Sequence, residues 1–142
     1  MTADAEVLLE RAGELLDAPD RTAAGNSARL AAFLTRQAVE DLIDARCAAL
    51  CGPQVLTGTR KAKLAVLKSL DSTTAATVLS GAWYRLTGFC HQHAYELAPT
   101  VAEVREECIA VKLYCLDEPS GSAKEAGPKP DRPTPRTHST SQ

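Results

Sequence analysis

The chain has 142 residues, and its 16 lysines and arginines against 18 aspartates and glutamates give a formal net charge of −2. This near-neutral balance provides no global electrostatic attraction for nucleic acid, so any RNA or DNA contact has to rest on a local patch. No run approaches ~18 apolar residues and no apolar run follows Met1, so we expect neither a membrane span nor a signal peptide. The five cysteines are therefore expected to be reduced thiols of a cytoplasmic protein.

Apolar residues recur at helical spacing in the first half of the chain. They predict a first helix over about Asp4–Asp17, ended by Pro19, and a second over about Ser27–Leu50, ended by Gly52-Pro53. The predicted buried stripe of the first helix is Ala5, Leu8, Ala12 and Leu15. That of the second is Leu30, Leu34, Ala38, Leu42, Ala45 and Ala49, widened by Phe33, Ile43, Cys47 and Leu50. The wider stripe indicates that the second helix is buried on two sides.

Three further helices are predicted in the second half. A loop over Gln54–Thr59 leads to a short helix over about Arg60–Leu70. The fourth helix is expected to be capped by Asp71 or Ser72 and to run to Leu97, with Pro99 stopping it. The fifth follows Thr100-Val101-Ala102-Glu103, a capping box in which the Thr hydroxyl and the Glu carboxylate satisfy free amides. Its predicted inner stripe is Val101, Val104, Cys108, Val111 and Cys115.

No segment alternates apolar and polar residues as a strand would. The sequence therefore predicts an all-α fold, an antiparallel bundle of about four to five helices over residues 1–116. Residues 117–142 are rich in Pro, Ser and Thr and contain almost nothing apolar. Such a segment cannot bury enough surface to offset its ordering entropy, which predicts a disordered tail.

Candidate chemistry concentrates in the segment from Trp83 to Leu97, which holds the only tryptophan and two of the three histidines. His93 falls on the apolar stripe of the predicted fourth helix, which favours a core position over a site position. His91 falls on the opposite stripe, among hydroxyl and aromatic residues. It is either an interface residue or a titratable catalytic group, because histidine changes charge near neutral pH.

Two glycines, Gly81 and Gly88, flank Arg85 on one side of the same helix. Each costs about 1 kcal/mol of helix propensity relative to alanine, which suggests that something approaches the backbone closely there. A packed helix of the same chain, a second subunit and a phosphate group all fit this pattern. We expect a homodimer through this face.

Other polar clusters have weaker interpretations. Cys47, Cys51, Cys90 and His93 could meet as metal ligands, but mid-helix cysteines are more often small apolar residues, so we predict no metal and no cofactor. Basic residues cluster at the start of the third helix, and they are either phosphate ligands or a solvated face. They are Arg60, Lys61 and Lys63.

The acidic residues of the second and fifth helices are expected to be solvated. They are Glu40, Asp41, Asp44, Glu106 and Glu107. Arg36 and Glu40 are expected to form an ordinary surface ion pair.

The spacing Arg85-Leu86-Thr87-Gly88-Phe89-Cys90-His91 places five residues between an arginine and a histidine. It resembles the R-x(4–6)-H motif of HEPN domains, helical bundles found in bacterial toxins, phage-defence effectors and CRISPR ribonucleases. The runs 34–43 and 90–100 are also similar to small members of this family. The resemblance covers about 29–116, and it departs from the family pattern at Leu86, where a polar residue usually follows the arginine.

The resemblance implies a homodimer in which Arg85 and His91 of both subunits line one cleft and cleave RNA without a metal. His91 would take the 2′-hydroxyl proton, Arg85 would stabilise charge on the phosphate, and Gln92 and Tyr95 would orient the substrate. The alternative is a non-catalytic HEPN-like module that dimerises or binds another protein as a scaffold or regulatory partner. Leu86, the acidic net charge and the lack of an extended basic surface favour that alternative.

Overall fold

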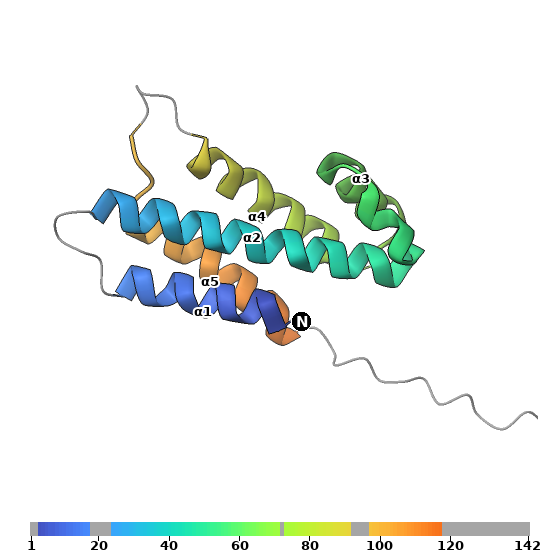
Figure 1. The fold of residues 1–142 in the computed structure, drawn as a ribbon, viewed down its shortest axis with the longest axis horizontal. Helices are drawn as coiled ribbons and strands as arrows, with labels where there is room; N and C mark the ends of the chain where they lie inside the picture. Colours follow the sequence, from blue (N-terminus) through green and yellow to red (C-terminus); the bar gives the residue numbers. More distant parts are fainter. Residues whose placement is uncertain (1–2, 18–23, 72, 92–96, 118–142) are drawn as a thin grey trace, which may run out of the picture.

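The computed structural model describes residues 3–17, 24–71, 73–91 and 97–117, and within these ranges it contains helices and turns but no strand. The helices are α1 (Ala3–Asp17), α2 (Ala24–Cys51), a 3₁₀ turn η1 (Pro53–Thr57), α3 (Arg60–Leu70), α4 (Ala75–Cys90) and α5 (Val101–Asp117). The prediction of an all-α antiparallel bundle is confirmed (Figure 1). The predicted loop over Gln54–Thr59 overlaps η1. The predicted tail lies outside the described residues apart from Asp117.

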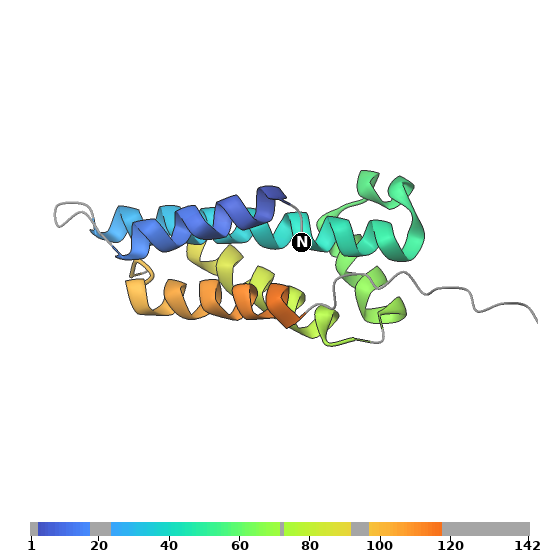
Figure 2. The ribbon, with the colours of Figure 1, turned by 90° about the horizontal axis from the view of Figure 1, so that it is seen from below.

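The long helix α2 is the centre of the bundle. It packs against α1, α3, α4 and α5, and α5 also contacts α1 and α4. In Figure 1, α1 and α4 flank α2 on opposite sides, while α3 lies at the C-terminal end of α2. Figure 2 shows that successive long helices run in opposite directions, so the end of α5 lies beside the start of α1.

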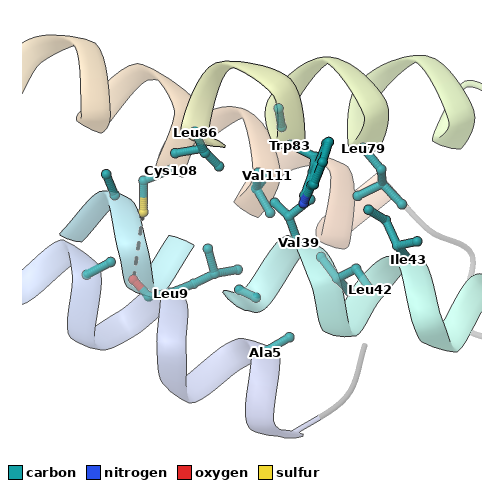
Figure 3. Close-up of a cluster of buried hydrophobic side chains, with 14 of the residues drawn as sticks. Ala5, Leu9, Val39, Leu42, Ile43, Leu79, Trp83, Leu86, Cys108 and Val111 are labelled. Carbon is teal, nitrogen blue, oxygen red and sulfur yellow. Dashed lines mark hydrogen bonds between the residues drawn. The ribbon is translucent and has the colours of Figure 1, made fainter. Parts of the chain in front are cut away.

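Side chains from all four long helices form one apolar core (Figure 3). Leu9 comes from α1, Val39 and Ile43 from α2, and Leu86 from α4, and each of these is almost wholly buried. The core is rich in alanine along α2, which lets the neighbouring helices approach closely. Burial of each large aliphatic side chain stabilises the fold by about 1.5–3 kcal/mol, so this cluster fixes how the four long helices pack together.

The predicted stripe of α2 is correct at Ala38, Leu42, Ile43 and Cys47, which are buried. It is wrong at Leu30, which is half exposed, and at Ala45 and Ala49, which are exposed, and it omitted the buried Thr35. The physical reason is that α1 and α4 pack on two sides of α2, so the buried arc is broad and its centre cannot be located from periodicity alone. In α1, Ala5 and Ala12 are buried as predicted, but Leu9 and Leu16 are buried in place of Leu8 and Leu15.

Helix α4 is shorter than predicted. It begins at Ala75 rather than after a cap at Asp71 or Ser72, and it ends at Cys90 rather than at Leu97. Asp71 instead accepts hydrogen bonds from the Thr73 amide at 2.9 Å and from the Thr73 hydroxyl, which in turn accepts from the Ala75 amide at 3.1 Å. At the other end, Gly88 weakens the last turn, and His91 leaves the helical region at φ −101° and ψ 52°.

The capping box before α5 is confirmed. The Glu103 amide donates to the Thr100 hydroxyl at 3.2 Å, and the Thr100 amide donates to the Glu103 carboxylate at 2.8 Å. Hydrogen bonds from the Thr100 amide and hydroxyl lower the pKa of the Glu103 carboxyl. The predicted inner stripe of α5 is also confirmed at its centre, where Val104, Cys108 and Val111 are buried. No helix in the described part of the chain is both long and apolar enough to cross a bilayer.

Candidate functional site: the Arg85 pair, the charged network and the outer face of α5

Arg85 is held by Glu107 across the contact between α4 and α5. The guanidinium donates through both Nε and Nη2 to the two carboxylate oxygens, with the Nη2–Oε2 distance at 3.1 Å. The Arg85 side chain is 57% exposed, whereas the Glu107 side chain is only 11% exposed. The hydrogen bonds that Arg85 donates to Glu107 raise the pKa of Arg85 above its ordinary value. The expectation that Glu107 is a solvated charge is therefore wrong, because α5 turns this carboxylate toward α4.

The two glycines that flank Arg85 have different surroundings. A Cβ added at Gly81 would lie 3.1 Å from Arg85 Nη1, so the missing side chain leaves room for the guanidinium itself. A Cβ added at Gly88 would meet nothing within 4 Å. The two glycines predicted a close approach to the backbone. Among the described residues, Arg85 of the same helix makes that approach at Gly81, and Gly88 faces open space.

His91 is exposed at the C-terminal cap of α4, where its amide donates to the Thr87 carbonyl oxygen at 3.0 Å. Six residues of α-helix turn through about 600°, so positions 85 and 91 lie on faces about 120° apart and about 9 Å apart along the axis. The helix therefore does not place Arg85 and His91 on one face of a single chain. The other predicted residues of this segment, Gln92, His93 and Tyr95, lie outside the described residues.

The basic cluster at the start of α3 is turned toward α2. Arg60 donates to the Glu40 carbonyl oxygen at 3.0 Å and to Asp44 at 2.7 Å, and Lys63 donates to the same Asp44 oxygen at 2.8 Å. Lys63 is buried, while Lys61 is exposed. Of the three predicted phosphate ligands, two are thus engaged by a carboxylate. The expectation of a solvated basic face fails at Lys63, and the expectation of a solvated acidic face fails at Asp44.

Glu40 links this cluster to α4. Its carboxylate accepts a hydrogen bond from Trp83 Nε1 at 3.1 Å and lies 3.3 Å from Arg36 and 3.8 Å from Arg60. The Arg36 guanidinium also lies 5.9 Å from the centroid of the Trp83 ring, within the range of a cation–π contact. The pair predicted between Arg36 and Glu40 is therefore part of a network that joins α2, α3 and α4.

The cysteines behave as small apolar residues where they are buried. Cys47 donates its thiol hydrogen to the Lys63 carbonyl oxygen at 3.4 Å, and Cys108 contacts the Leu9 carbonyl oxygen at 3.8 Å (Figure 3). Burial raises the pKa of the Cys47, Cys90 and Cys108 thiols, which keeps them protonated at neutral pH. Among the described residues, no three metal-binding side chains come together, and His93 lies outside that set.

Sequence reasoning missed a second apolar stripe on α5, on the side away from the core. Ile109, Leu113 and Leu116 are 49%, 58% and 78% exposed. Their i, i+4, i+7 spacing places them on one face, and this spacing is the signal that could have found them. Beside this stripe, a groove of about 290 Å³ separates α5 from α1, and its lining is Glu6, Leu9, Glu10, Lys112, Cys115 and Leu116.

No protein-family model matches the chain, and comparisons with curated proteins and with solved structures found no significant match.

Proposed function

We propose that this protein is a non-catalytic helical interaction module, similar in role to the HEPN-like modules that dimerise or bind other proteins. The observation that carries the proposal is the two-sided apolar character of α5. Its inner residues Val104 and Val111 are buried, and its outer residues Ile109, Leu113 and Leu116 are largely exposed. A contiguous apolar stripe on a surface helix is characteristic of a site where another protein packs.

The arrangement of the charged residues supports an interaction module over a ribonuclease. Arg85 donates to both oxygens of a nearly buried carboxylate, so stabilising a phosphate would require it to share or leave that partner. Arg60 and Lys63 both donate to one oxygen of Asp44. A ribonuclease needs these cations oriented toward the substrate, whereas in this protein they join helices to one another.

Self-association through the outer face of α4 is the first activity that we assign to the module. Tyr84 is exposed on this face, and Gly88 leaves the backbone accessible one helical turn further along. Small residues of this kind allow two helices to approach closely, and an exposed tyrosine provides a large amphipathic contact. The proposed assembly is a homodimer in which α4 faces α4 of the second copy.

Sedimentation of the purified chain and two variants tests this proposal. The wild-type protein should sediment as a dimer at tens of micromolar, and Gly88→Leu should shift it to monomer. Ala65→Leu is the matched control, because it enlarges an exposed small residue of α3 that lies away from this face. The wild-type protein sedimenting as a monomer, or the two variants dissociating equally, would contradict self-association through α4.

A further inference from the structure

We infer that the outer stripe of α5 and the adjoining groove bind a basic amphipathic helix of another protein. This inference rests on the proposed function and specifies the chemistry of one partner. The docking surface consists of Ile109, Leu113 and Leu116 together with the groove residues Glu6, Glu10 and Lys112. The stripe is on the solvent-facing side of α5, and the groove lies between α5 and α1.

The apolar part of the docking surface suits a helix. Three large aliphatic side chains follow one another at i, i+4 and i+7, which is the spacing at which an amphipathic partner presents its own side chains. Leu116 is shared between the stripe and the groove, so the two features form one continuous surface. The groove is also lined by Leu9 and Cys115, against which a partner side chain could be desolvated.

The charges around the stripe determine which sign of charge a partner must carry. Glu6 and Glu10 of α1 line the groove, and Glu106 lies one turn before Ile109 and Ala110 on the outer side of α5. All three are exposed, and none of the ion pairs found among the described residues involves them. Among the residues that the structure describes, Lys112 is the one cation that lines the groove. The surface is therefore net acidic, and a partner with lysine or arginine beside its apolar face complements it.

Other occupants fit this surface less well. Residues 118–142 contain no Leu, Ile, Val, Met, Phe, Trp or Tyr, so the chain's own C-terminal segment has no side chains with which to cover an apolar stripe. A second copy would bring the same excess of carboxylates to both sides of the interface. An anionic lipid surface or a nucleic acid would be repelled by the same carboxylates.

Fluorescence anisotropy with two labelled model peptides tests the inference. Both peptides have about 18 residues, long enough to form a helix, and share one leucine stripe. One carries lysine and arginine on its flanks, and the other carries glutamate. We expect the basic peptide to bind at least about tenfold more tightly than the acidic peptide, with the difference shrinking at high salt. Equal affinity for both peptides, or no binding of either, overturns the inference.

Variants of the full chain locate the binding surface. Leu113→Gln should weaken binding of the basic peptide about tenfold or more, whereas Leu70→Gln should leave it unchanged. Leu70 is the matched control, because it is 56% exposed on α3, far from α5. Replacing Glu6, Glu10 and Glu106 together by Gln should reduce the preference for the basic peptide, while Glu14→Gln should not. Circular dichroism shows whether each variant is folded, and equal losses at Leu113 and Leu70 overturn the inference.

The same measurements separate the inference from the proposed function. If the peptides fail to bind while the wild-type protein still sediments as a dimer that Gly88→Leu dissociates, the interaction module stands and the α5 partner is wrong. If Leu113→Gln is what converts dimer to monomer, the occupant of the stripe is a second copy and the inference is overturned. Cleavage of RNA that depends on Arg85 and His91 would instead overturn the proposed function.

Discussion

Arg85 is restrained by a carboxylate that is almost enclosed by the bundle, and this contact decides what the arginine can do. Glu107 offers both oxygens, and the guanidinium meets them with Nε and Nη2. A bidentate pair fixes the direction of the arginine as well as its charge. Arg85 therefore acts first as a link between α4 and α5, and its exposed edge is what remains for another molecule.

Removing the charge of Glu107 should weaken this link. Glu107→Gln should lower the free energy of unfolding by about 1–2 kcal/mol, a value kept small because the Arg85 side chain is more than half exposed. Glu106→Gln changes the neighbouring, exposed glutamate and should stay within about 0.5 kcal/mol of the wild type. Urea denaturation measures both variants. Equal stability of the two would show that the Arg85–Glu107 pair does not contribute.

Asp71 should make the bundle sensitive to acid. Hydrogen bonds from Arg46, at 2.8 Å and 3.1 Å, and from Thr73 hold the pKa of this carboxyl well below its usual range. A carboxyl with a lowered folded-state pKa contributes stability above its unfolded-state pKa of about 4. That contribution is lost as the pH falls from about 4 toward the lower folded-state value.

Thermal melts between pH 7 and pH 2.5 measure this contribution. The melting temperature of the wild type should fall below about pH 4, and Asp71→Asn should start lower at pH 7 and fall less over the same interval. Other carboxyl groups titrate in both proteins, so the difference between the two curves isolates Asp71. Parallel curves would show that Asp71 does not carry the acid sensitivity.

At the scale of single elements, α5 carries apolar residues both on its core side and on its outer side. Its inner side joins the core through Val104 and Val111, while its outer side presents Leu113 to solvent. Periodicity alone identified the inner stripe because the capping box fixes where the helix begins. It did not identify the outer stripe, because the inner residues alone were enough to predict a helix in this segment.

Two leucine variants distinguish a core side from a docking side. Leu86 of α4 is fully buried, so Leu86→Ala should cost about 2–5 kcal/mol through lost burial and the cavity left behind. Leu113→Ala should change stability by no more than about 0.5 kcal/mol, because Leu113 is mostly exposed. Chemical denaturation of the two variants provides the comparison. A large loss at Leu113 would mean that this side chain belongs to the fold and is not a docking residue.

The limits of prediction differ between elements for physical reasons. The bounds of α3 and the cap of α5 depend on local hydrogen bonds, such as that from the Ala62 amide to the Thr59 hydroxyl at 3.2 Å, and local sequence predicts them. The buried arc of α2 and the partner of Glu107 depend on which helices pack where. Contacts separated by 22 residues, as between Arg85 and Glu107, leave no signal in a local pattern.

At the scale of the whole molecule, many charged side chains form ion pairs and hydrogen bonds between helices, whereas several large apolar side chains are exposed at the surface. Arg60, Lys63 and Trp83 tie α3 and α4 to carboxylates of α2. The exposed apolar residues of α5 have no comparable structural partner among the described residues. This distribution agrees with the proposed interaction module, because the outer residues of α5 are not part of the core that holds the fold together.

The measurement that tests the central claim most directly is incubation of the purified chain with several structured and single-stranded RNAs in EDTA, read on denaturing gels. The interaction-module account predicts that every RNA stays intact, in the wild-type protein as in Arg85→Ala and His91→Ala. Cleavage by the wild type that both variants abolish, while circular dichroism shows them folded, would contradict the account. Arg85 and His91 would then be catalytic residues of a metal-independent ribonuclease.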